Sequence, residues 1–185
     1  TGGTCTGILI EDVETHNSGT VNAASGIMNE PMCHATTYRR VHSHHNGVAG
    51  GTGGHGLYQQ GDNVIIEHSS FHDNRSFGLQ CYNSTTLSDG LPNNCIVRYN
   101  SIQDNVTGGI ALEGNDGQIY RNFIQGNPAG INVGYGGALR TKVVNNTLID
   151  NPSSGISVGA FGSASNSTIR NNIVFGSATA VTIAA

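Results

Sequence analysis

Short runs in which apolar and polar residues alternate recur along the whole chain. The stretch 118–136 illustrates the pattern, since polar residues and glycines separate its apolar side chains Ile119, Ile124, Ile131 and Val133. Each run is too short for a helix, and an apolar spacing close to two is typical of a strand with one buried face. The pattern therefore predicts many short strands joined by tight turns.

The run is part of an internal repeat. Two loose copies precede residue 64, and five clearer copies follow at 64–83, 96–115, 118–136, 142–160 and 168–185. One copy cannot bury its apolar side alone, but stacked copies can, because each strand then pairs with its equivalents above and below. We therefore expect one all-β domain over residues 1–185, a right-handed, single-stranded parallel β-helix (a solenoid) of about seven coils.

Columns of asparagine and glycine support the register between copies. Asparagine recurs at the corner between the first two strands of a copy and again at the start of the next loop, and glycine opens the third strand. We expect the asparagines to adopt left-handed backbone angles and to hydrogen-bond along a ladder, and the glycines to permit a tight turn or bulge. The columns are Asn100, Asn122, Asn146 and Asn172; Asn46, Asn74, Asn105, Asn127 and Asn151; and Gly26, Gly56, Gly78, Gly109, Gly130 and Gly155.

Composition narrows the classes of function. Only 11% of the residues are charged, the formal net charge is −4, and no basic run exists, so the sequence does not favour a nucleic-acid-binding protein. No apolar stretch approaches the roughly 18 residues of a membrane-spanning helix. We therefore expect neither nucleic acid nor a membrane as a partner.

Four cysteines allow three disulfide pairings. Cys81 and Cys95 flank the longest polar insertion, and Cys5 and Cys33 lie at the edges of the first coil, so we expect the pairs 5–33 and 81–95. The alternative is a buried free thiol at Cys81, which falls on an inward position of its strand. Disulfides indicate an oxidising compartment, and we expect a secreted or periplasmic protein.

The repeat resembles the right-handed parallel β-helix family of carbohydrate-active proteins, which includes pectate and alginate lyases, polygalacturonases and mannuronan epimerases. The string at 72–79 resembles the D-P-H-D region of mannuronan epimerases, although Ser70 and Phe71 replace its Asp-Pro and Asn74 is inserted. The tripeptide at 54–56 matches a short polygalacturonase motif, but the paired aspartates that accompany it there are absent. The resemblance implies a polysaccharide partner on the outward face of the third strands, and lyase or epimerase chemistry on an acidic, uronate polymer.

Polar outward rows on the third strands are the expected binding surface. Their Tyr, Gln, Asn and Glu side chains can stack on sugar rings or hydrogen-bond to hydroxyls. The rows are Met28, Tyr58, Gln80, Ala111, Asn132 and Ser157, and, beside them, Gln60, Tyr82 and Glu113. Among these we expect the substrate to be bound by Gln60, Gln80, Glu113 and Asn132.

All eight histidines lie between residues 16 and 72. A carboxylate beside a histidine fixes its tautomer and raises its pKa, as a general base or acid requires. Asp73 beside Asp104 would repel unless a cation such as Ca²⁺ bridged them, and the sequence specifies no cofactor beyond that. The same residues could also form only a solvated polar edge. The repeat places His16, His45, Asp73, Asp104 and Asp150 in one column, and His44, His72, Gln103 and Gln125 in the next.

Removal of the C5 proton of a uronic acid is the leading chemistry. It needs a base, an acid and a cation near the substrate carboxylate. The candidate bases are His45, His55 and His72, the candidate acids are Tyr58 and Tyr82, and the candidate cations are Arg75, Arg39 and Arg40. We expect Arg75 to be the cation of this catalytic neighbourhood.

Three alternatives stay open. Glu113 and Asp73 could serve as the two carboxylates of an inverting hydrolase. His42 and His44, on one face of an extended strand, could bind Zn²⁺ or Cu²⁺ together with His16 or His55. A non-catalytic rod could bind carbohydrate or assemble end to end, because open solenoid ends expose strand edges.

Overall fold

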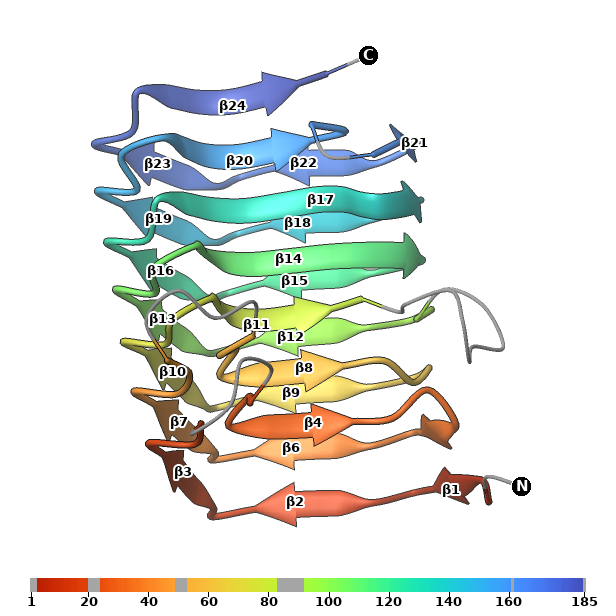
Figure 1. Ribbon diagram of the computed structural model, residues 1–185. Coiled ribbons are helices and arrows are strands. Elements are labelled where there is room, and N and C mark those ends of the chain that lie inside the picture. The colour runs from red at the N-terminus through yellow and green to blue at the C-terminus, as the bar shows by residue number, and fades with distance from the viewer. Residues whose placement is uncertain (1–2, 20–23, 49–52, 83–91, 161, 185) are drawn as a thin grey trace.

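The computed structural model describes residues 3–19, 24–48, 53–82, 92–160 and 162–184. All of the regular secondary structure in these ranges is β-strand. Within the same ranges, no helix is long and apolar enough to cross a membrane. The strands wind into coils that stack as a rod, with the chain termini at opposite ends (Figure 1). The expected parallel β-helix is thus confirmed.

Three parallel sheets run along the rod, each with a path of seven strands. The first sheet contains β2 (Leu9–Glu11), β6 (Thr37–Arg39), β9 (Ile65–Glu67), β12 (Ile96–Arg98), β15 (Gln118–Tyr120), β18 (Lys142–Val144) and β22 (Thr168–Arg170). The second contains β3 (Glu14–His16), β7 (His42–His44), β10 (Ser70–His72), β13 (Ser101–Gln103), β16 (Phe123–Gln125), β19 (Thr147–Ile149) and β23 (Ile173–Phe175). The third contains β4 (Ile27–Asn29), β8 (Leu57–Gln59), β11 (Phe77–Cys81), β14 (Gly108–Asn115), β17 (Ala129–Leu139), β20 (Ser154–Val158) and β24 (Thr179–Ile183). In addition, β21 (Ala164–Ser165) pairs with β17, and β1 (Cys5–Thr6) pairs with β5 (Cys33–His34).

The core consists of files of apolar side chains that run along the rod. In the second sheet, for example, the strand register aligns four fully buried residues, Phe71, Ile102, Ile124 and Leu148. Paired strands lie about 4.8 Å apart, so each side chain packs on its equivalents in the neighbouring coils. Stacking thus supplies the burial that a single repeat cannot achieve.

Two ladders of buried asparagines follow the corners before and after the second sheet. In the second ladder, Asn105 Oδ1 accepts hydrogen bonds from the backbone N–H (3.1 Å) and the Nδ2 (2.9 Å) of Asn74, and Asn105 Nδ2 donates to Asn127 Oδ1 at 2.9 Å. Equivalent side-chain bonds connect Asn46 through Asn151 and Asn100 through Asn172. The ladders therefore satisfy backbone amides that the sheets leave unpaired at the corners.

The backbone roles expected for the asparagine and glycine columns were wrong. The left-handed residue is the one before each ladder asparagine, with φ of 57° at Tyr99, 55° at Arg121 and 51° at Asp104. The ladder asparagine contributes its buried amide instead. The glycines are required by close approach, since a Cβ on Gly109 would lie 2.6 Å from the carbonyl oxygen of Gly130 in the next coil.

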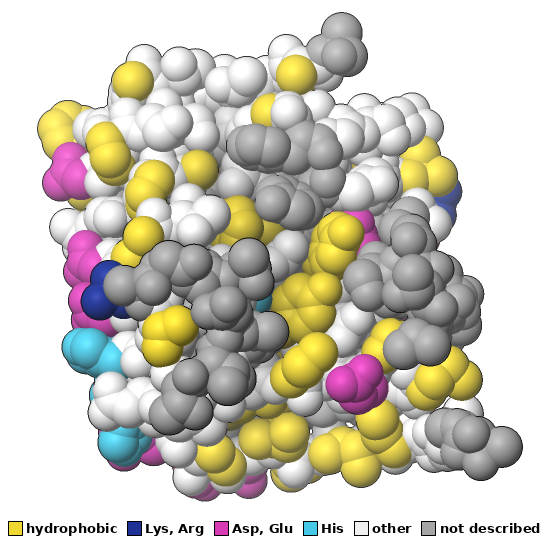
Figure 2. Space-filling model, viewed as in Figure 1, with side chains coloured by type: hydrophobic (Ala, Val, Ile, Leu, Met, Phe, Trp, Pro, Cys, Tyr) yellow, Lys and Arg dark blue, Asp and Glu magenta, His cyan; other side chains and the backbone are white. Residues whose placement is uncertain are grey.

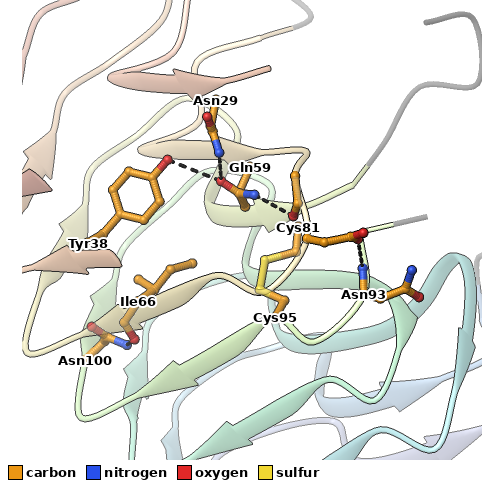
Figure 3. Close-up of a disulfide and its surroundings, with 10 residues drawn as sticks. Asn29, Tyr38, Gln59, Ile66, Cys81, Asn93, Cys95 and Asn100 are labelled. Atoms are coloured by element: carbon orange, nitrogen blue, oxygen red, sulfur yellow. Dashed lines mark hydrogen bonds between the residues drawn. A yellow bond between two sulfur atoms is a disulfide. The ribbon is translucent and has the colours of Figure 1, made fainter. Parts of the chain in front are cut away.

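Both expected disulfides are present. Cys5–Cys33 joins β1 to β5 in adjacent coils, where the two residues are also paired in the strand register. Cys81–Cys95 lies in the core and connects the end of β11 to the residue before β12 (Figure 3). Cys81 is therefore not a free thiol.

A buried polar group lies near the second disulfide (Figure 3). Gln59 Oε1 accepts hydrogen bonds from Asn29 Nδ2 at 2.6 Å and from the Tyr38 hydroxyl at 3.2 Å. Tyr38 is fully buried, and its burial raises the pKa of the phenol. The alternation of the strands predicts apolar residues at these inward positions, so the hydrogen bonds compensate for polar atoms inside the core.

We predict that Asn105→Ala destabilises the fold by about 2–4 kcal/mol, because it leaves buried donors of Asn74 without an acceptor. Urea unfolding followed by circular dichroism measures the change. Gln125→Ala is the matched control, since this amide lies on the partly exposed outward side of β16, and it should cost less than about 1 kcal/mol. Equal losses for the two variants would contradict a stabilising ladder.

Candidate functional site

The predicted site residues divide between two neighbouring surfaces. Tyr58, Gln80 and Asn132 lie in one register row of the third sheet, together with Met28, Ala111 and Ser157, as expected. His45 and His72 instead lie at the edge formed by the second sheet, where β7 and β10 end. Figure 2 shows these two regions as a hollowed face containing hydrophobic side chains and, at its left edge, a group of histidines near acidic side chains.

Most of the polar side chains expected to bind substrate on the third-sheet face are buried. Gln60, Gln80, Glu113 and Asn132 are each at most 5% exposed. Tyr58 and Tyr82 are half-buried, and their ring centroids lie 6.3 Å apart. The two tyrosines therefore offer more accessible area than the four residues expected to bind substrate. Residues 49–52, and residues 83–91 of the polar insertion between Cys81 and Cys95, lie outside the described residues.

His55 and Tyr58 form a stacked pair on this face. Their ring centroids are 5.3 Å apart, and the ring of Phe77 also stacks on His55, with centroids 6.0 Å apart. His55 is 8% exposed, and its Nδ1 has no hydrogen-bond partner among the described residues. Burial lowers the pKa of His55 to about 4, so the ring is neutral near pH 7.

Tyr58, by contrast, keeps its proton. Burial raises the pKa of its phenol to about 12, with further contributions from the neighbouring Tyr82, Glu113 and Glu30. A neutral imidazole therefore stacks on a protonated phenol at neutral pH. Both side chains are therefore uncharged at pH 7, and the imidazole can accept a proton while the phenol can donate one.

The histidine group lies on the outward side of the second sheet. Its register aligns His16, His44 and His72, followed by Gln103 and Gln125. The placement of His16 beside His45 was therefore wrong. The cause is visible in the second ladder, where Ser18 occupies the asparagine position of the first coil.

Ser18 Oγ donates to Asn46 Oδ1 at 2.8 Å, so it is residue 18 and not Asn17 that aligns with the asparagine column. Asn17 takes the corner position that His45, Asp73 and Asp104 occupy in later coils, and all four have left-handed backbones. Aligning the repeats on asparagine alone displaced the first coil by one residue. One residue is enough to move a side chain to the other side of a strand.

Close contacts order the rings of the group. His72 Nδ1 lies 2.7 Å from Asp73 Oδ2, and His72 Nε2 lies 2.7 Å from His42 Nε2. His44 stacks parallel to His72 with ring centroids 4.9 Å apart. Burial, followed by repulsion from His44 and His72, lowers the pKa of His42. The contacts join His42, His72 and Asp73 in one hydrogen-bonded array.

A small pocket of about 370 Å³ lies at the adjoining corner, and His45, Asp73, Arg75 and Asp104 contribute to its lining. Its volume is at the lower end of ligand-binding cavities. The expected proximity of Asp73 and Asp104 is confirmed, and Arg75 brings a positive charge into the same pocket. Glu113 lies on the third sheet instead, so the two carboxylates suggested for hydrolysis belong to different surfaces.

Arg39 and Arg40 do not belong to either surface. Arg39 Nε lies 2.7 Å from Glu67 Oε1 and Arg40 Nε lies 2.6 Å from Asp12 Oδ1, at and just after β6 of the first sheet. Of the three arginines considered, Arg75 alone is next to the candidate residues. Its neighbour Ser76 donates a backbone hydrogen bond of 3.0 Å to Gly54, the residue before His55.

Sequence reasoning missed Glu14. This residue pairs with His42 in the strand register, and its Oε1 lies 3.1 Å from His44 Nε2. The hydrogen bond from His44 lowers the pKa of Glu14. The sequence did contain a signal for this contact. Glu14 lies two residues before His16, and alternate residues of a strand lie on the same side of the sheet.

Comparison with known proteins gives the fold and family. The structure is similar to that of a double mutant of the periplasmic alginate epimerase AlgG, with a TM-score of 0.55 and 19% identity over 99% of this chain and 52% of that one. A second AlgG structure gives a TM-score of 0.47 and 18% identity over 99% and 51% of the two chains. The chain thus spans about half the length of these enzymes.

Among curated proteins, none matches the chain. The family model described as "Right handed beta helix region" matches residues 3–148. This range includes most of the coils and both candidate surfaces. The chain therefore belongs to the right-handed β-helix family.

Proposed function

We propose that the protein acts on an acidic, uronate polysaccharide by removing the C5 proton, as a lyase or an epimerase does. The observation that carries the proposal is the neutral imidazole of His55, whose Nδ1 has no hydrogen-bond partner among the described residues, stacked on the protonated phenol of Tyr58. The similarity to AlgG is consistent with this chemistry but supports only the fold by itself.

His55 is the proposed base and Tyr58 the proposed acid. His55 takes the C5 proton, and the electron pair left on C5 delocalises into the adjacent carboxylate. Arg75 would stabilise that charge, and its position beside the His55 segment supports this role. Donation of the Tyr58 proton to the opposite face of C5 would give the epimer. Loss of the substituent at C4 would instead give an unsaturated product and a new chain end, with Tyr58 protonating the leaving oxygen.

The substrate would contact the third-sheet face mainly through Tyr58 and Tyr82. Their half-buried rings can stack on sugar rings. Gln60, Gln80 and Glu113 are buried behind this surface and would position it, while Asn132 has a buried Oδ1 without a partner among the described residues.

His72 and His45 are the competing bases. The bond from His72 to Asp73 supports the first, because a carboxylate orients the imidazole and increases its basicity. We prefer His55 because its Nδ1 has no hydrogen-bond partner among the described residues and the protonated phenol of Tyr58 stacks on its ring. The two disulfides support a secreted or periplasmic location, where such polymers occur outside the reducing cytosol.

We predict that His55→Gln and Tyr58→Phe each lower turnover on pectate, alginate or a glycosaminoglycan by at least about 100-fold. Proton NMR in D₂O detects loss of the C5 proton signal for both reactions, and ultraviolet absorbance detects the unsaturated product of a lyase. His68→Gln, which changes an exposed histidine just after β9, should keep full activity.

Two outcomes would contradict this assignment. Activity that survives His55→Gln but not His72→Gln would move the base to the histidine group. If the wild-type protein exchanges no C5 proton on any of these polymers, the catalytic proposal fails. Binding of the same polymers without turnover would then favour the non-catalytic alternative.

We also predict that the free energy of unfolding decreases by up to about 3 kcal/mol as the pH falls from about 6.5 to about 4. The pKa of His55 is lowered to about 4 in the folded protein. The unfolded chain therefore takes up a proton in this window before the folded chain does, so the stabilisation is complete above the window and lost through it. Urea unfolding at several pH values measures the slope.

His55→Gln should flatten this dependence, and His68→Gln should preserve it. The lowered pKa of His42 contributes in the same direction, so some slope should persist in the His55 variant. An unchanged slope in His55→Gln would show that the ring is not held neutral by burial.

A further inference from the structure

Glu14, His42 and His44 form a compact group that the proposed catalytic site does not use. The register places Glu14 beside His42 and His16 beside His44. Residues 42 and 44 point outward from β7, because Ser43 between them is fully buried. One side chain of the first coil therefore meets two of the second on the outer surface.

Their potential ligand atoms are close enough for one metal ion. Glu14 Oε1 lies 3.1 Å from His44 Nε2 and 3.9 Å from His42 Nδ1. One ligand atom from each of the three residues lies within 4.8 Å of the others. Tetrahedral zinc with bonds of about 2.0–2.2 Å places its ligand atoms about 3.3–3.6 Å apart. Small side-chain rotations would bring this group into that range, since Glu14 and His42 are 58% and 47% exposed.

The donor chemistry of the group suits a cation. Two imidazole rings and one carboxylate each offer a ligand atom to the same point. Metal ligands bind in their deprotonated forms, so metal binding here would compete with protons.

The other ring nitrogens already have partners. His44 Nδ1 lies 2.7 Å from His45 Nδ1, and His42 Nε2 lies 2.7 Å from His72 Nε2. His72 in turn is bonded to Asp73. Hydrogen bonds of this kind orient ligating imidazoles and select their tautomers in metal sites.

We propose that Glu14, His42 and His44 bind one divalent transition-metal ion, with Zn²⁺ or Cu²⁺ as the fitting ions and water in the remaining position. Imidazole together with carboxylate is a donor set that suits these ions. The ion would connect the first coil to the second, which Cys5–Cys33 also joins. It would therefore stabilise the N-terminal end of the rod.

Isothermal titration of the metal-free protein with Zn²⁺ tests the proposal. We expect saturable binding in which Glu14→Gln and His44→Ala each lower the affinity by at least about tenfold. Glu14→Gln keeps the size of an exposed side chain, so circular dichroism should show an unchanged fold. His68→Ala is the control and should bind as the wild type does.

Electron paramagnetic resonance with Cu²⁺ gives a second readout. We expect nitrogen hyperfine coupling from two imidazoles, reduced to one in His42→Ala. The absence of saturable Zn²⁺ binding would overturn the proposal. Binding that is unchanged in both Glu14→Gln and His42→Ala would also overturn it, because the ion would then lie among His45, His72 and Asp73. Neither result bears on His55, so this test is independent of the proposed catalysis.

Discussion

In-register stacking of parallel strands is the constraint on which the molecule depends. Backbone hydrogen bonds run from coil to coil, so a residue is held against its equivalents in the neighbouring coils. The corners interrupt this pairing and would leave buried amides without partners. The asparagine ladders supply those partners, with each Oδ1 accepting from both the backbone and the side chain of the preceding asparagine. Packing of the apolar files and satisfaction of the corners are therefore two consequences of one register.

The same register creates a difficulty on the outer surface, because identical charges would stack at about 4.8 Å. The first sheet avoids this by alternation. Glu11, Arg39, Glu67 and Arg98 are successive members of one file. Burial alone would raise the pKa of Glu67, but hydrogen bonds from Arg39 and Arg98 outweigh it and keep the pKa low. Ionic pairs thus stabilise this face without any apparent chemical role.

The second sheet resolves the same difficulty differently. His16, His44 and His72 form one file, and their flat rings stack along it with centroids 5.3 Å and 4.9 Å apart. Stacking by register therefore concentrates nitrogen donors, and Glu14 adds a carboxylate at one end. On the third sheet, burial rather than repetition distinguishes His55, because it lies between Phe77 and Tyr58 instead of in a file of histidines. The two candidate sites thus depend on different physical causes.

The sequence alone was sufficient for the fold, the outward row of the third sheet and both disulfides. The fold and the row follow from repetition and alternation, and the disulfides follow from where the cysteines lie relative to the coils and to the polar insertion. Spacing could not identify the left-handed corner residues, which precede the asparagines of the ladders. It also misplaced His16, because Ser18 replaces the asparagine that marks the register in the first coil. It also could not separate His55 from His45 and His72, or place Glu14 against His44. Those relations depend on how loops of unequal length close each coil, and only the three-dimensional path of the backbone determines which side chains meet and which are removed from water.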